Sequence, residues 1–229
     1  MQFYRRWQPP VALSFDLDDT LYDNHPNISR ANQWMDDILA DELGQRINWA
    51  IYKARVLQQN PMLIHDVTEC RRAWLYLGLK EQGIPSPETR ADELLDDFIA
   101  IRSDFSVPEQ SHRLLERLAG QFPLVAMTNG NVDVQAIGIA DYFTHVFYAG
   151  GPYRQKPYPD LFDAAAAALN LQAWQIAHIG DDPITDVYGA LCHGYQAIWL
   201  NEQQESMTVN LPHVALDDLL ELPHLLDAR

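Results

Sequence analysis

The chain repeatedly places a short apolar run directly before a cluster of polar residues. Three such pairs are residues 11–15 before Asp16, residues 123–127 before Thr128, and residues 176–180 before Asp181. Apolar runs this short, bounded by breakers and polar residues, are typical of buried strands. Helical patterns lie between the runs. The sequence therefore predicts an α/β fold with a Rossmann-like parallel sheet core and helices on both faces.

Residues 23–105 interrupt this alternation and show long helical patterns with almost no strand signal. Asp66 and Glu69 have the spacing of a capping box at a helix start, and apolar residues continue behind them at helical spacing. The most economical organisation is an α/β core made of residues 1–22 and 106–229, with a helical insertion at 23–105.

The formal net charge of −16 restricts the partners of the chain. It repels nucleic-acid backbones and anionic membranes, so neither is expected as a partner. An anionic substrate needs local cations inside its site. The two cysteines, Cys70 and Cys192, have no disulfide or zinc-site spacing, and neither a signal peptide nor a membrane-spanning apolar run is found. These features predict a soluble, cytoplasmic protein.

Polar residues follow the predicted strands at their carboxyl ends, where open α/β sheets bind ligands. They are Asp16 and Asp18, Thr128, and Asp181 with Asp186. Carboxylates gathered in one pocket repel one another unless a cation lies between them, and Mg²⁺ binds carboxylate, water and phosphate oxygens. The sequence therefore predicts a magnesium site that receives a phosphorylated small molecule.

The same residues can be given chemical roles. A carboxylate beside Mg²⁺, such as Asp16, can attack phosphorus to form an aspartyl-phosphate. Asp18 lies two residues on, where it can protonate the leaving alkoxide and then activate water. Lys156 can neutralise the attacking carboxylate, and the Thr128 hydroxyl can hold the phosphoryl group in line. The catalytic candidates are Asp16, Asp18, Thr128 and Lys156; the substrate-binding candidates are Thr128, Asn129 and Lys156.

Four motifs occur in an order that characterises one enzyme family: Asp16-Leu17-Asp18-Asp19-Thr20, Thr128-Asn129-Gly130, Lys156-Pro157, and Gly180-Asp181-Asp182 through Asp186. On these motifs the chain resembles the haloacid dehalogenase-like superfamily. The resemblance implies that Asp16 is the nucleophile and Asp18 the general acid/base. It implies that Mg²⁺ is held by the carboxylates of Asp16 and Asp181 and the backbone carbonyl of Asp18, with Asp186 in support. It also implies that the insertion is a small helical cap that selects the substrate.

A narrower resemblance, to bacterial flavin-pathway phosphatases, extends through most of the chain. It rests on segments that include residues 15–24, 65–68, 128–131 and 149–152. It implies 5-amino-6-(5-phospho-D-ribitylamino)uracil, FMN or both as substrates in riboflavin biosynthesis. Sugar phosphates or nucleotides remain alternative substrates, and a phosphomutase or dehalogenase reaction is an alternative on the same scaffold. The carboxyl of Asp18 favours phosphoryl chemistry, since halide release needs no proton donor there.

Several of these residues also have structural interpretations. Gly130 suits a turn that needs a positive φ, and Lys156 taken alone would be a solvated surface lysine. His178, inside an apolar run, is expected to be a core histidine with satisfied hydrogen bonds. Arg71 and Arg72 could reach a phosphate or a ring, although arginines on a helix more commonly lie on a solvated face.

Overall fold

The structure is a computed structural model that describes residues 1–204, 206 and 210–227. Within this range, a seven-stranded sheet has the order β1-β7-β6-β5-β2-β3-β4. The strands are β1 (Gln2–Phe3), β2 (Ala12–Phe15), β3 (Leu124–Thr128), β4 (His145–Tyr148), β5 (Ile176–Gly180), β6 (Gln196–Leu200) and β7 (Val214–Leu216). Neighbours pair in parallel except β1 and β7, which pair antiparallel. The predicted α/β class is confirmed, with one antiparallel edge strand added.

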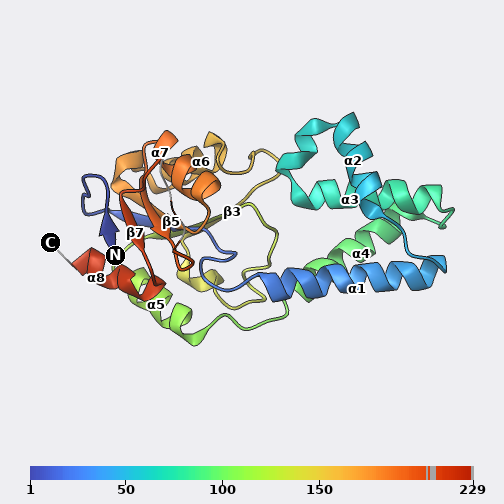
Figure 1. Cartoon of the computed structure of the whole chain (residues 1–229), viewed down its shortest axis with the longest axis horizontal. Coiled ribbons are helices and arrows are strands. Elements are labelled where there is room, and N and C mark those ends of the chain that lie inside the picture. The colour runs from blue at the N-terminus through green and yellow to red at the C-terminus, as the bar shows by residue number, and fades with distance from the viewer. Residues whose placement is uncertain (205, 207–209, 228–229) are drawn as a thin grey trace.

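Helices lie on both faces of the sheet and in a separate lobe (Figure 1). The α-helices of the described residues are α1 (His25–Leu43), α2 (Trp49–Gln59), α3 (Val67–Glu81), α4 (Pro87–Arg102), α5 (Glu109–Ala119), α6 (Pro159–Leu169), α7 (Gly189–Cys192) and α8 (Leu222–Asp227). A π-helical turn, η4 (Pro183–Tyr188), precedes α7. In the part of the chain that the structure describes, no helix combines the length and apolar character needed to cross a membrane.

The central strands are buried on both faces because their side chains alternate between two cores. Leu13 and Phe15 of β2 pack in the cluster that contains the buried leucines of α5 and α8. Ala12 packs in the opposite cluster with Leu161 and Phe162 of α6. In Figure 1, α5 and α8 lie on the opposite side of the strands from α6. Such double coverage explains why the strands appear in the sequence as nearly continuous apolar runs.

The helices α1 to α4, named here the helical segment, form a lobe with a core of its own (Figure 1). Ala31, Met35 and Leu39 of α1 recur at every fourth position and are buried in that core. The ring of Trp49 lies against Gly78, where a Cβ would come within 2.3 Å of Cζ3. The domain boundaries at 22/23 and 105/106 stay a prediction.

Candidate functional site

The carboxyl ends of β5, β2 and β3 lie side by side, because these three strands are neighbours and run parallel. Asp16 directly follows β2, and its backbone N–H donates to the carbonyl of Ile179 in β5 (2.9 Å). Thr128 is the last residue of β3, and Asp181 directly follows β5. The polar residues of three distant sequence segments therefore meet at one edge of the sheet.

A buried ion-pair network joins Asp16 to Asp186 through Lys156. The Nζ of Lys156 lies 2.6 Å from Oδ1 of Asp16 and 2.7 Å from Oδ1 of Asp186. Lys156 is 1% exposed, so it is not a solvated surface lysine. Oδ1 of Asp186 also lies 3.2 Å from Nε2 of His178, whose Nδ1 lies 3.0 Å from Oγ of Ser14. His178 is thus a buried histidine with both ring nitrogens partnered, as predicted, and it extends the network into the sheet.

Burial and charge set the protonation of this network. Burial lowers the pKa of Lys156, but its two carboxylate partners outweigh this and raise the pKa above its ordinary value. Burial raises the pKa of Asp186, yet Lys156 and His178 hold it below the usual range. Burial raises the pKa of Asp16 well above its ordinary value, because Lys156 offsets only part of the desolvation. A second cation beside Asp16 would favour its charged form.

The side chain of Asn129 holds the backbone of Lys156. Its Oδ1 accepts from the N–H of Lys156 (2.7 Å), and its Nδ2 donates to the carbonyl of the same residue (3.0 Å). Both polar atoms of this side chain therefore position Lys156. Neighbouring Thr128 is buried, and its Oγ1 accepts from the N–H of Gly130 (2.9 Å).

The carboxylate of Asp18 has different partners from that of Asp16. Nη2 of Arg102, at the end of α4, lies 3.0 Å from both Oδ1 and Oδ2 of Asp18, and the Tyr22 hydroxyl donates to Oδ1 (2.7 Å). Nη1 of Arg102 donates to Oδ1 of Asn131, whose Nδ2 donates to Oγ1 of Thr68 near the start of α3 (3.1 Å). The helical segment thus contacts Asp18 directly. No sequence signal singles out Arg102, because an arginine at a helix end is common. Tyr22 lies just after the Asp16–Thr20 motif, but no pattern marks it as a partner of Asp18.

Gly130 leaves room for the carboxylate of Asp18. A Cβ at this position would lie 2.5 Å from Oδ2 of Asp18 and 3.3 Å from Nη1 of Arg102. The φ angle of Gly130 is not positive, so its interpretation as a positive-φ turn residue is wrong. The position requires glycine because a side chain there would displace Asp18.

Carboxylate oxygens of Asp16, Asp181 and Asp186 lie within 4.8 Å of one another and could hold a metal ion. Burial, with repulsion from Asp186, raises the pKa of Asp181 to about 6. Asp186 already uses Oδ1 on Lys156 and Oδ2 on the N–H of Asp182 (3.0 Å). Asp16 and Asp181 are then the better placed ligands, and two carboxylates with elevated pKa values fit a hard divalent cation such as Mg²⁺.

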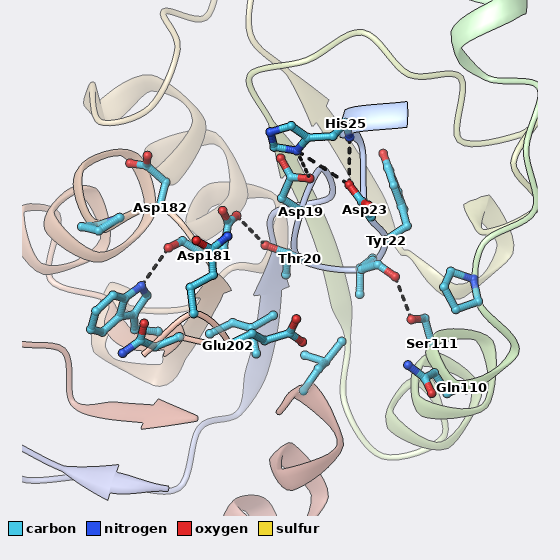
Figure 2. Close-up of a pocket in the computed structure, with 18 residues that line it drawn as sticks. Asp19, Thr20, Tyr22, Asp23, His25, Gln110, Ser111, Asp181, Asp182 and Glu202 are labelled. Carbon is cyan, nitrogen blue, oxygen red and sulfur yellow. Dashed lines mark hydrogen bonds and ion pairs between the residues drawn. The ribbon is translucent and has the colours of Figure 1, made fainter. Parts of the chain in front are cut away.

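A cavity of about 760 Å³ lies beside Asp181, between the loop after β2 and the loops after β5 and β6. Figure 2 shows Asp19, Asp23 and His25 on one side, and the Thr20 hydroxyl donating to Asp181 (3.0 Å). Its acidic lining repels a phosphate. The cations Lys156 and Arg102 are not among its lining residues.

Comparison with known proteins identifies the scaffold. The profile of the haloacid dehalogenase-like hydrolases matches residues 11–194, which include the three strand ends and the helical segment. The chain belongs to the haloacid dehalogenase-like hydrolase family. This confirms the resemblance that the four motifs indicated.

Two curated relatives of this family member are phosphatases. The 5-amino-6-(5-phospho-D-ribitylamino)uracil phosphatase YigB of Escherichia coli is 35% identical, over 99% of this chain and 100% of that protein. A phosphoserine phosphatase of Thermus thermophilus is 27% identical, over 82% of this chain and 88% of that protein. Family and relatives together make the chain a phosphoric monoester hydrolase, as predicted.

Solved structures of the family share the architecture. A 2-haloacid dehalogenase from Pseudomonas syringae has a TM-score of 0.89 and 33% identity, covering 94% of this chain and 97% of that one. The hydrolase YfnB of Bacillus subtilis, solved bound to magnesium, has a TM-score of 0.68 and 20% identity, covering 96% and 100%. The second likeness shows the haloacid dehalogenase-like fold alone.

Proposed function

We propose that this hydrolase is a Mg²⁺-dependent phosphatase in which Asp16 is the nucleophile and Asp18 the general acid/base. The observation that carries the proposal is that these two carboxylates have different contact partners. Asp16 contacts Lys156 in a buried network, whereas Asp18 contacts Arg102 and Tyr22. Two carboxyl groups two residues apart are thereby given different surroundings, which is how one site assigns nucleophilic and proton-transfer roles.

The reaction proceeds in two displacements on phosphorus. An oxygen of Asp16 attacks phosphorus while the bond to the ester oxygen breaks, and the carboxylic acid form of Asp18 gives its proton to the leaving alkoxide. Asp18, now ionised, takes a proton from a water molecule that attacks the phosphorus of the aspartyl-phosphate. Inorganic phosphate leaves and the carboxylate of Asp16 is restored. Thr128 holds phosphoryl oxygens, and Lys156 keeps Asp16 oriented through their 2.6 Å contact.

The metal requirement follows from the charge of the site. Lys156 is one cation among three buried or half-buried carboxylates, Asp16, Asp181 and Asp186. The carboxylates of Asp16 and Asp181 would hold Mg²⁺, which when bound offsets the negative charge on the phosphoryl oxygens. We expect EDTA to abolish phosphate release and added Mg²⁺ to restore it. Full turnover in EDTA, after dialysis against chelator, would contradict the proposed requirement.

For the substrate, we propose 5-amino-6-(5-phospho-D-ribitylamino)uracil, FMN or both, with the helical segment acting as the cap over the site. The support is the 35% identity to YigB over nearly the whole of both chains, because it includes the proposed cap. Steady-state kinetics on both flavin-pathway phosphates, sugar phosphates and nucleotides test the choice. Higher kcat/KM on a sugar phosphate or nucleotide would overturn it.

A dehalogenase reaction is the second candidate, because the Pseudomonas syringae neighbour with a TM-score of 0.89 is a 2-haloacid dehalogenase. The half-buried proton-transfer group Asp18 and the acidic cluster of Asp16, Asp181 and Asp186 favour phosphate ester cleavage instead. Halide release from a 2-haloacid, measured beside phosphate release, separates the two reactions.

We also propose a cytoplasmic location for the protein. The two cysteines form no disulfide in the structure, which supports this proposal.

Gly130→Ala tests the role of Asp18 without removing it. We expect kcat on an aryl phosphate to fall by about 100-fold, because the new methyl group displaces the Asp18 carboxylate by roughly an ångström. The free energy of unfolding should fall by less than about 3 kcal/mol, because the shifted carboxylate weakens its ion pair with the buried Arg102 but does not remove it. Gly120→Ala is the matched control, because nothing lies closer than 3.5 Å to a Cβ there. Equal kcat values in the two variants would argue against Asp18 as the proton donor.

A further inference from the structure

Two adjacent arginines of α3 differ in their partners. Arg72 forms ion pairs with Glu69 (3.3 Å) and Asp92 (2.8 Å). Arg71 pairs with no carboxylate among the described residues: its Nη1 lies 3.3 Å from Oδ1 of Asn32 and 3.8 Å from Sδ of Met35. In a chain with twice as many acidic as basic residues, a half-buried guanidinium without a carboxylate partner requires an explanation.

Arg71 lies close to the point where the helical segment meets the site. Its Cζ lies 3.7 Å from the ring centroid of Phe98. Phe98 precedes Arg102 by four residues, so both lie on one face of α4. Thr68, which binds Asn131 beside Arg102, precedes Arg71 by three residues on α3. Arg71 therefore lies about one helical turn beyond the contact with Asp18, on the side away from the sheet.

The surroundings of Arg71 compensate its charge only in part, through the attraction of Asp36, with which it forms no ion pair. Burial, with repulsion from Arg102, lowers the pKa of Arg71 to about 10, so the side chain is cationic at neutral pH. The rings of Phe98 and Trp74, whose centroids lie 3.7 and 5.6 Å from Cζ, offset part of the desolvation. A ring face satisfies the flat side of a guanidinium but accepts none of the N–H groups at its edge. Nη1 already donates to Asn32 and Met35, so the N–H groups of Nη2 and Nε, which have no hydrogen-bond partner among the described residues, are the ones that a ligand can use.

We propose that Arg71 binds the leaving group of the substrate through a flat, carbonyl-bearing ring that extends past Asp18. The proposal rests on the proposed phosphatase function and deepens it. A guanidinium donates two parallel N–H bonds to a planar set of oxygens, which suits the carbonyl edge of a pyrimidine-type ring. The substrate class is then a phosphomonoester whose ring lies several bonds from phosphorus, on a chain long enough to reach from Asp16 to α3.

Three variants and two substrates test this assignment. Arg71→Met keeps a long stem against Phe98 but removes the donors, Arg71→Lys keeps the charge, and Arg72→Met is the matched control. FMN carries a carbonyl-bearing ring; phenyl phosphate carries a ring without carbonyls. We expect Arg71→Met to lower kcat/KM on FMN by about 10- to 100-fold and on phenyl phosphate by less than about 3-fold. Arg71→Lys should recover part of the loss, and Arg72→Met should leave both substrates near parent values.

An equal change on both substrates, or no change on FMN, would overturn the role of Arg71. A thermal melt of each variant identifies loss of folding, which would affect both substrates alike. Should the parent enzyme not hydrolyse FMN, the proposed substrate is wrong but Arg71 can still be judged. Inhibition of phenyl phosphate hydrolysis by riboflavin is then the readout, and the inhibition constant should rise about 10-fold or more in Arg71→Met. Riboflavin that does not inhibit the parent, or inhibits both equally, refutes the inference.

Discussion

Asp16→Asn should lower kcat on an aryl phosphate by about four orders of magnitude or more, because the amide cannot form the aspartyl-phosphate. The isosteric amide fills the same space beside Lys156, so the fold should persist. The measurement is release of inorganic phosphate at saturating Mg²⁺, together with far-ultraviolet circular dichroism. Turnover near the parent value would falsify the nucleophile assignment.

The control for this variant is Asp97→Asn on α4. Asp97 is exposed on α4, and its substitution by Asn removes the same charge from a residue outside the site at the strand ends. Its kcat should match the parent. A similar loss in both variants would trace the effect to net charge and not to a nucleophile.

Lys156→Met should have the largest effect on stability. It leaves the carboxylates of Asp16 and Asp186 buried without their shared cation, and breaking a buried ion pair costs about 3–5 kcal/mol. We expect the free energy of unfolding, from urea denaturation, to fall by about that amount. Activity should be lost as well, since Asp16 would then favour its protonated form. A decrease in the free energy of unfolding of less than about 1 kcal/mol would show that the ion pairs of Lys156 do not stabilise the free protein.

A second variant protects this test against failure to fold. Lys156→Met combined with Asp186→Asn removes one of the two uncompensated carboxylates and should recover part of the lost stability. Lys53→Met is the surface control, because Lys53 is exposed on α2. No recovery in the double variant would mean that Lys156 stabilises the fold through packing and not through charge.

The sequence predicted those parts of the fold that rest on local patterns. Strands β2, β3 and β5 are buried on both faces, so they appear as apolar runs, and their polar followers mark the site edge. Strand β1 has two residues, Gln2 and Phe3, which is too few to show alternation. It exists because Gln2 and Phe3 pair with Ala215 and Val214 near the other end of the chain, and no local pattern records such a pairing.

The candidate site shows the same division. Asp16, Lys156, Asp181 and Asp186 could be selected because each belongs to a motif next to a strand or helix. Arg102 could not be selected, since its contact with Asp18 joins residues 84 positions apart and depends on how the helical segment packs against the α/β core. Gly130 was singled out for the wrong reason, because the space needed by a neighbouring carboxylate leaves no mark on the backbone pattern.

The network from Asp16 through Lys156 and Asp186 to His178 and Ser14 also limits how this enzyme can evolve. Lys156, Asp186 and His178 each contact two other residues of the network. A single substitution at any of these three positions therefore leaves at least one buried polar group without its partner. Compensated changes must arrive together, which makes them rare. Divergence of substrate preference is therefore expected to accumulate in the helical segment, while these five positions drift little or change as a set.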